Sequence, residues 1–200
     1  MRITGGTLRG RRLKTPTAGG LRPTQDAVRE AVFSMLSNVV AGSRFLDLFA
    51  GTGAVGIEAF SRGATSVTWL EKEPRNFRLL QENMSALCSD SLWLKAVCAD
   101  VFQWLARAAM PAGARAAQLF DIVYADPPYE SESSPDRTAE IMGALAAAGI
   151  VAEGAFFVAE QRATVAAPVV AGWEPVTERR YGRTKIMMYR KCLDTFNPDS

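Results

Sequence analysis

The sequence predicts an α/β fold in which a mostly parallel sheet is covered by helices on both faces. The chain has 200 residues, of which 48% are apolar, so it suits one domain with a sizeable core. After Gly42, apolar runs of strand length alternate with stretches of helix length, the pattern that right-handed crossovers between parallel strands produce. We expect this domain to span residues 23–192, with a short segment, 1–22, before it and a tail, 193–200, after it.

The predicted elements follow in a regular order. The segment QDAVREAVFSMLS (25–37) indicates a helix that Thr24 can cap. One face of this helix collects apolar side chains: Val28, Ala31, Val32, Met35 and Leu36. The sequence then predicts strand 44–50, helix 54–62, strand 66–72, helix 74–87, strand 92–98, helix 101–110, strand 119–125, helix 137–148 and strand 154–161. Two final strands, 173–180 and 185–191, are joined through YGRT and predict an antiparallel pair that closes one edge of the sheet.

The front of the chain is basic. Residues 1–30 hold seven Lys or Arg and two Asp or Glu, and glycines between short alternating stretches predict that 1–20 form a small hairpin arm without a core of its own. A second basic run without acids lies near the C-terminus: Arg179, Arg180, Arg183, Lys185, Arg190 and Lys191. Each cluster alone is also compatible with solvated surface charge, but two clusters that frame one domain favour contact with nucleic-acid phosphates. The residues expected at RNA are Arg9, Arg11, Arg12, Lys14 and Arg180.

The composition narrows the possible chemistry. The chain has no histidine, which removes the commonest general base and the commonest metal ligand. Cys88, Cys98 and Cys192 are widely spaced without a C-x-x-C pair, so we expect neither disulfides nor a metal site, and three buried hydrophobes instead. Apolar stretches fall short of the roughly 18–20 residues of a membrane span, and no signal-peptide pattern opens the chain, so we expect a cytoplasmic protein.

Four acids mark the carboxyl ends of successive predicted strands. Asp47 lies in DLFAGTG at the end of the first strand, and the next three strands end in Glu71, Asp100 and Asp126. Ligands of open parallel sheets bind outside these ends, near the point where the strand order reverses. We therefore expect one edge of the sheet to collect four carboxylates beside a glycine-rich turn.

The glycine turn and its neighbouring acids favour an adenosyl cofactor. Gly51, Gly53 and Gly56 match the G-x-G-x-x-G turn of dinucleotide binders, although a turn that serves packing alone is an alternative. An acid as deep as Asp47 needs partners such as loop amides or an ammonium group, and it would repel a pyrophosphate. S-adenosylmethionine carries an ammonium group, a ribose and an adenine, and the sequence offers one carboxylate to each: Asp47, Glu71 and Asp100. Asp100 can also cap the next helix, where the Val101 amide would meet the adenine.

The tetrapeptide DPPY follows the strand that ends in VYA. Proline cannot donate to a sheet ladder, so Pro127 and Pro128 must lie beyond the last paired residue. An exocyclic amino group of a base is a poor nucleophile, and the Asp126 carboxylate and the Pro127 carbonyl can each accept one of its hydrogens. Tyr129 offers a ring for stacking a flipped base. A proline-rich turn with a capping acid is the structural alternative, and the polar stretch ESESSPDR that follows is either a lid over RNA or an ordinary loop.

The chain resembles the RsmD-type methyltransferases, which methylate the N2 amino group of one guanine in small-subunit ribosomal RNA. The resemblance rests on RITGGTLRGRRL, LRPTQDAVREAVFSML, FLDLFAGTGAVGIEAFSRGA, EKEPRNFRLLQEN and DIVYADPPY. It implies the class I S-adenosylmethionine-dependent methyltransferase fold, which is Rossmann-like and seven-stranded, with catalytic residues Asp126, Pro127, Pro128 and Tyr129. The cofactor residues that it implies are Arg22, Thr24, Asp47, Phe49, Ala50, Gly51, Gly53, Glu71, Lys72, Asp100 and Val101. Arg183 in the YGRT turn departs from the acid or amide expected there, which concerns RNA contacts rather than the active site.

The expected function is S-adenosylmethionine-dependent methylation of a guanine N2 in small-subunit ribosomal RNA. The expected partner is ribosomal RNA or an assembly intermediate of the small subunit, and we expect a monomer without membrane contact. One alternative is a methyltransferase acting on amino groups of DNA or of other RNA, although 200 residues leave no room for a large target-recognition domain. Others are an RNA-binding protein without catalysis and a nicotinamide-dependent oxidoreductase, which rests on the glycine turn alone.

Overall fold

The structure, a computed structural model, describes residues 1–16, 26–88, 93–108, 119–128 and 137–193. Its helices are α1 (Asp26–Met35), α2 (Ala54–Ser61), α3 (Pro74–Leu87), α4 (Val101–Arg107) and α5 (Thr138–Ala148). Its strands are β1 (Arg44–Leu48), β2 (Ser66–Glu71), β3 (Leu94–Cys98), β4 (Phe120–Ala125), β5 (Val151–Arg162), β6 (Trp173–Tyr181) and β7 (Thr184–Lys191). Each predicted helix and strand is therefore present, with differences at the ends.

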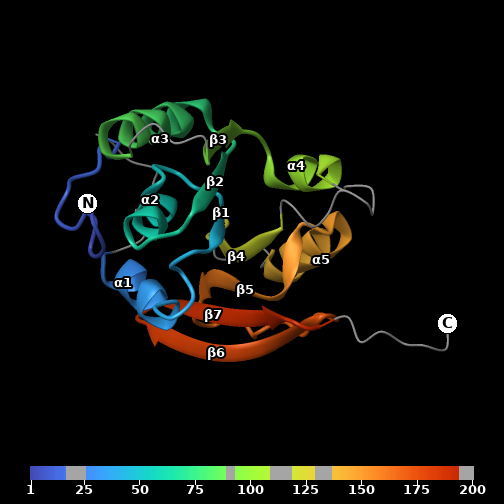
Figure 1. The fold of residues 1–200 in the computed structure, drawn as a ribbon. Coiled ribbons are helices and arrows are strands. Elements are labelled where there is room, and N and C mark those ends of the chain that lie inside the picture. Colours follow the sequence, from blue (N-terminus) through green and yellow to red (C-terminus); the bar gives the residue numbers. More distant parts are fainter. Residues whose placement is uncertain (17–25, 89–92, 109–118, 129–136, 194–200) are drawn as a thin grey trace.

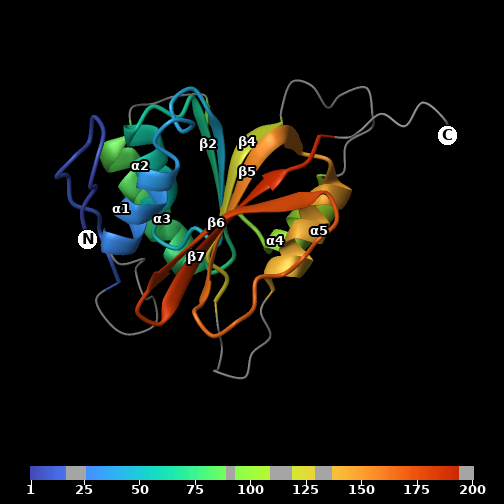
Figure 2. The same cartoon turned by 90° about the horizontal axis from the view of Figure 1, so that it is seen from below.

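The strands form one seven-stranded sheet in the order β3-β2-β1-β4-β5-β7-β6. β1 to β5 are parallel, whereas β7 is antiparallel to both β5 and β6, which confirms the predicted closing pair. Helices α1, α2 and α3 lie on one side of the sheet and α4 and α5 on the other (Figure 1), and Figure 2 shows the sheet between these two layers. The strand order reverses between β1 and β4, so ligands are expected at the carboxyl ends of this pair.

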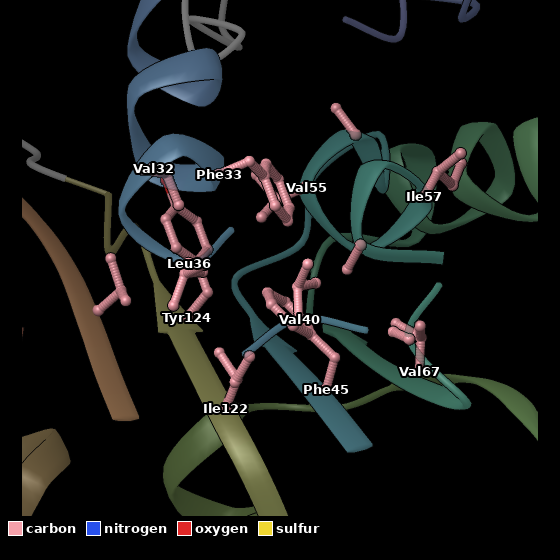
Figure 3. Close-up of a cluster of buried hydrophobic side chains, with 14 of the residues drawn as sticks. Val32, Phe33, Leu36, Val40, Phe45, Val55, Ile57, Val67, Ile122 and Tyr124 are labelled. Atoms are coloured by element: carbon pink, nitrogen blue, oxygen red, sulfur yellow. The ribbon is translucent and has the colours of Figure 1, made fainter. Parts of the chain in front are cut away.

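Each face of the sheet buries its own apolar core. Below α1, α2 and α3 the core contains Phe33, Phe45 and Trp69, none of which has exposed surface. Figure 3 shows side chains of α1 and of the strands, Tyr124 among them, in the layer between helix and sheet. A separate core lies below α4 and α5. Because β1 and β4 are packed on both faces, side chains at their carboxyl ends are held by a rigid frame.

The first 16 residues form a short hairpin that is packed on the domain. Arg2 and Arg12 make an antiparallel bridge, so the predicted hairpin is present. Ile3 and Leu13 are 1% and 6% exposed and belong to the core below α1, α2 and α3. The hairpin has no core of its own, as expected, but it is an integral part of the domain's core rather than an appendage.

A buried carboxylate on α2 fixes this hairpin. Glu58 has no exposed surface, and it accepts hydrogen bonds from the backbone N–H groups of Thr4 (2.8 Å) and Gly5 (2.7 Å). The guanidinium groups of Arg29 (3.3 Å) and Arg62 (2.9 Å) also donate to it. Glu58 therefore joins the hairpin, α1 and α2, with both cations and amides satisfying its charge.

The buried face of α1 differs from the predicted one. Ala31 and Met35 are only half-buried, whereas Arg29 and Phe33 have no exposed surface. Arg29 is buried because its guanidinium group reaches Glu58 and, through a short hydrogen bond, the carbonyl of Arg2. The hydrophobic pattern could not reveal this, since an arginine in a helix is usually exposed.

Strand β5 begins at Val151 instead of the predicted residue 154. Phe120 of β4 pairs with Val151, but Ile122 pairs with Phe156, so the register shifts between them. Gly154 in this irregular part has φ 71°, a conformation that side chains rarely adopt. The predicted strand therefore started too late, because Gly154 lies inside β5, in the part where the register shifts.

The cysteine prediction is only partly right. Cys88 is buried, whereas Cys98 is exposed and Cys192 is half-buried, and all three are free thiols. Among the described residues, no helix is long and apolar enough to cross a bilayer.

Candidate cofactor and base site

Asp47 lies deep in the sheet at the point where the strand order reverses. It belongs to β1 between β2 and β4, is 1% exposed, and accepts the N–H of Gly56 at 2.9 Å. Burial raises the pKa of Asp47 to about 8; the Gly56 bond lowers it, and the charge of Glu71 raises it further. Among the described residues, no Lys or Arg forms an ion pair with Asp47. This carboxyl group therefore lacks the cation that a buried negative charge requires.

The loop from Phe49 to Gly53 turns back sharply between β1 and α2. Phe49 has φ 62°, and it is the only non-glycine residue with positive φ in the described part of the chain. Such a conformation costs roughly 1–2 kcal/mol and is often kept at binding sites. The loop is held by bonds from the N–H of Ala50 to the Leu70 carbonyl and from the N–H of Gly53 to the Ala50 carbonyl, both 2.8 Å. No sequence signal marks Phe49, because left-handed phenylalanine is rare.

Two of the loop glycines are explained by packing. A Cβ atom on Gly53 would lie 2.2 Å from Cδ1 of Leu80, and one on Gly56 would lie 2.1 Å from Nε1 of Trp69. The Trp69 indole N–H also donates to the Gly53 carbonyl at 3.3 Å. The packing alternative thus accounts for Gly53 and Gly56, and the contact of this loop with a cofactor stays a prediction.

Glu71 ties the loop to the end of β2. One of its carboxylate oxygens accepts the N–H of Gly51 at 2.7 Å, and the other accepts the N–H of Glu73 at 2.7 Å. Burial raises the pKa of Glu71, against the lowering effect of these amides. A carboxylate oxygen can accept two hydrogen bonds, so Glu71 keeps acceptor capacity for hydroxyl groups beside the loop.

Asp100 performs the capping role that the sequence suggested. Its Oδ1 accepts the N–H groups of Phe102 (3.1 Å) and Gln103 (3.2 Å) at the start of α4. Its Oδ2 lies 3.4 Å from Nζ of Lys72, which is mostly exposed. Partial burial raises the pKa of Asp100, but the capping bonds and Lys72 outweigh it and lower the pKa below the ordinary value. Asp100 therefore carries a charge at neutral pH.

Asp126 follows β4 directly and is partly buried, close to the buried Asp47 and the partly buried Glu160. Burial raises the pKa of Asp126 well above its ordinary value, and the charges of Glu160 and Asp47 raise it further. Pro127 beside it is buried, and Pro128 is exposed. β4 lies between β1 and β5: Asp47 pairs with Tyr124, two residues before Asp126, and Ala159 pairs with Ala125, so Glu160 and Asp126 are the next residues on their strands' paths.

Sequence reasoning missed Glu160 and Tyr124. The Tyr124 hydroxyl donates to Glu160 at 3.0 Å, and Tyr124 is 2% exposed. Burial raises the pKa of Glu160, while the bond from Tyr124 lowers it. Glu160 could have been identified as a site residue because it lies near the end of the predicted strand that follows DPPY. This segment was predicted only as a strand, and none of its side chains was given a role.

Asn83 is another missed residue near the loop. It is 1% exposed on α3, and its amide group donates to the carbonyls of Thr52 (2.9 Å) and Lys14 (3.1 Å). It also accepts the N–H of Lys14 at 2.8 Å. Asn83 thus connects the glycine-rich loop with the end of the N-terminal hairpin.

The predicted RNA-binding residues are distributed over two regions. Arg9, Arg11 and Arg12 are exposed on the hairpin, and Lys14 is exposed beside Glu82, with which it pairs at 2.8 Å. In the C-terminal run Arg180 is mostly exposed and pairs with Glu178 at 2.8 Å.

The C-terminal run is not a uniform basic surface. Lys185 is only 1% exposed and lies 3.4 Å from Glu178. Arg22, Thr24, Tyr129, the stretch 130–136 and the tail 194–200 lie outside the described residues.

The carboxyl ends of β1, β4 and β5 therefore form an acidic end of the sheet. Asp47, Asp126 and Glu160 all have raised pKa values because burial disfavours their charged forms. Such a site favours a ligand that carries positive charge or N–H donors, and it disfavours a pyrophosphate. The acidic end of the sheet therefore disfavours the nicotinamide-dependent oxidoreductase, the alternative that rested on the glycine turn.

Comparisons with known proteins agree with this description. The family described as "Conserved hypothetical protein 95" matches residues 1–190. The chain is 32% identical over 192 residues to "Ribosomal RNA small subunit methyltransferase D" of Escherichia coli (strain K12), covering 96% of this chain and 90% of the relative. It is 30% identical over 192 residues to the YlbH protein of Bacillus subtilis (strain 168), covering 96% and 99%.

A solved structure matches over nearly the same length. The yhhF protein of Escherichia coli superposes with a TM-score of 0.79 at 28% identity, over 97% of this chain and 99% of the other. The seven-stranded sheet is thus the Rossmann-like fold of S-adenosylmethionine-dependent methyltransferases. Since both the family match and the relatives span almost the whole sequence, the chain belongs to the RsmD family of methyltransferases.

Proposed function

We propose that this protein transfers the methyl group of S-adenosylmethionine to the N2 amino group of a guanine in small-subunit ribosomal RNA. The observation that carries the proposal is the position of Asp126 at the reversal point of the sheet, two residues beyond the partner of the buried Asp47 and close enough for the charge of Asp47 to raise its pKa. This arrangement brings an acceptor for the amine close to a buried carboxyl group that favours a positively charged methyl donor. Membership of the RsmD family supports the RNA substrate.

The residues of the chain fit this cofactor. Asp47 is buried without a cation of its own, and an ammonium group would satisfy its charge. Glu71 keeps acceptor capacity for ribose hydroxyls, and Asp100 is ionised and can accept from the adenine amino group. The bound cofactor supplies a methyl group on a positively charged sulfur, which is a good leaving group.

Asp126 and Pro127 act on the amino group of the base. Asp126 accepts a hydrogen bond from one N–H of the amino group, and the Pro127 carbonyl accepts one from the other. These two bonds draw the nitrogen lone pair out of conjugation with the ring and direct it at the methyl carbon. The bound cofactor would supply the methyl carbon to this nitrogen, and it would keep the electron pair of the broken carbon–sulfur bond as a neutral thioether. The nitrogen then holds an additional positive charge and loses a proton, which Asp126 can accept. No histidine is needed for this chemistry.

The hairpin is the expected RNA contact. Arg9, Arg11 and Arg12 are exposed on an element that Glu58 fixes to the domain, so they present a preformed basic surface. A docked hairpin loses less conformational entropy on binding than a free arm would.

The function is tested by mapping N2-methylguanine in ribosomal RNA from cells that lack the gene. We expect one such mark to disappear from small-subunit RNA and to return with the wild-type gene but not with Asp126→Ala. Purified protein should methylate assembled subunits or naked ribosomal RNA, and not duplex DNA. An unchanged pattern of N2-methylguanine, or transfer to DNA amino groups, would contradict the proposal.

A further inference from the structure

Glu160 and Asp126 lie side by side at the ends of two neighbouring strands. Ala125 of β4 pairs with Ala159 of β5 in parallel register, so the next residue of each strand is Asp126 and Glu160. Neighbouring strands are about 4.8 Å apart, which places these carboxyl groups within reach of two adjacent atoms of one ligand. The charge of Glu160 raises the pKa of Asp126, in addition to burial, as expected for two acids in one site.

Tyr124 fixes the orientation of Glu160. The Tyr124 hydroxyl donates to Oε2 of Glu160 at 3.0 Å, and its ring is packed in the core below α1, where it is 2% exposed. Tyr124 lies on β4 and Asp126 directly follows it, so the alternation of the strand, continued by one residue, places both on the same side of the sheet. A carboxylate has about four acceptor positions, and the bond from Tyr124 uses one of those of Glu160.

The three amino-bearing bases differ in the atom next to the amino group. In guanine the neighbouring ring nitrogen, N1, carries a hydrogen, so the edge presents two adjacent donors. In adenine and cytosine the ring nitrogen beside the amino group is an acceptor. A second carboxylate beside the amine acceptor therefore suits guanine, and it opposes the lone pair of the other two bases.

We infer that Glu160 accepts the N1–H of the target guanine while Asp126 accepts from its N2 amino group, so that Glu160 determines the choice of guanine over adenine and cytosine. This inference rests on the proposed function and names the residue that sets its base specificity. The two acceptors belong to two rigid strands, and Tyr124 holds one of them in place. Sites built to hydrogen-bond a substrate N–H reject analogues without it by factors of about 10⁴–10⁵.

The test uses two RNA substrates and the near-isosteric variant Glu160→Gln. One RNA carries guanine at the mapped position, and the other carries 2-aminopurine, which has the same amino group but an acceptor at N1. We expect wild-type protein to prefer guanine by at least about 100-fold in kcat/KM. In Glu160→Gln the amide N–H can donate to N1 of 2-aminopurine, so this preference should fall at least about tenfold.

Controls separate specificity from structure. Glu153→Gln changes an exposed glutamate of the same strand and should leave the preference unchanged. Tyr124→Phe removes the hydroxyl that orients Glu160, so the preference should fall less than in Glu160→Gln. The affinity of Glu160→Gln for S-adenosylhomocysteine should stay within about threefold of wild type in calorimetry.

The outcomes are distinguishable. An unchanged preference in Glu160→Gln, or a loss of cofactor affinity as large as the loss of turnover, would overturn the role of Glu160 and leave the proposed function intact. A wild-type protein that transfers no methyl group to guanine N2 would instead overturn the proposed function, and the inference with it.

Discussion

Glu58 on α2 and Asp47 on β1 are both buried carboxyls that contact α2 or belong to it, but their surroundings are opposite. Glu58 has no exposed surface and is surrounded by two guanidinium groups and two backbone amides. Asp47 is 1% exposed with one backbone amide, and burial raises its pKa to about 8. The comparison indicates that a buried acid supplied with cations stabilises the fold, whereas one without them marks a place for a ligand.

The largest expected effect is on stability and concerns Glu58. Glu58→Gln should lower the free energy of unfolding by about 3–5 kcal/mol, because the buried Arg29 guanidinium loses its buried carboxylate and keeps the partly exposed Asp26 as an ion-pair partner. Urea denaturation measures this, and hydrogen exchange of residues 1–16 should increase. Glu82→Gln is the matched control, since its exposed pair with Lys14 should contribute at most about 1 kcal/mol. Equal losses of unfolding free energy in Glu58→Gln and Glu82→Gln would contradict the claim that the buried Glu58 stabilises the fold more than an exposed pair does.

The next effect concerns catalysis at the acidic end. Asp126→Ala should reduce kcat about 10²–10³-fold, because one of the two acceptors of the amino group is lost in the transition state. The affinity for S-adenosylhomocysteine should stay nearly intact, as measured by calorimetry. If affinity and turnover fall together, Asp126 serves the cofactor rather than the amine.

Asp47→Asn should stabilise the ligand-free protein, opposite in sign to Glu58→Gln. The folded pKa of Asp47 lies near 8, above its ordinary value of 3.8, so its contribution to stability is present below about pH 4 and is lost as the pH rises towards 8. The advantage of Asp47→Asn over wild type should therefore grow from pH 5 to pH 8, by up to roughly 1.4 kcal/mol per pH unit. Urea denaturation at both pH values checks this; a constant difference would show that Asp47 is charged throughout.

The smallest effect is expected on RNA binding by the hairpin. Replacing Arg9, Arg11 and Arg12 with alanine should weaken RNA binding and lower the slope of log K against log salt by about 0.7 for each lost contact with single-stranded phosphate. Cofactor affinity should not change. Arg75→Ala, in an exposed arginine of α3, is the control and should change the slope less. An unchanged slope in the triple variant would assign the RNA surface elsewhere.

The sequence predicted the order of elements and the acids at the ends of four strands. This succeeded because strand ends are marked locally, by glycine after Asp47 and by prolines after Asp126, and parallel strands bring their carboxyl ends to one edge. Glu160 was missed because its approach to Asp126 depends on the pairing of β4 with β5, which contains a register shift. Local pattern does not encode such a shift.

The sequence also did not reveal which charged residues are buried. Arg29 and Lys185 are almost fully buried, although the predicted apolar face of the first helix left out Arg29, and Lys185 was assigned to a basic run. Their burial depends on distant partners, Glu58 for Arg29 and Glu178 for Lys185. A charge that is satisfied by a residue far along the chain cannot be recognised from local periodicity.

The most direct test of the central claim is calorimetric titration with S-adenosylmethionine at pH 7, in two buffers of different ionisation enthalpy. Asp47 is largely protonated at this pH in the free protein and must ionise to hold an ammonium group, so binding should release a proton, with a stoichiometry approaching roughly one. Asp47→Asn should release less and bind more weakly. Binding of S-adenosylmethionine without proton release would contradict the claim that Asp47 at the acidic end of the sheet binds the cationic group of the ligand.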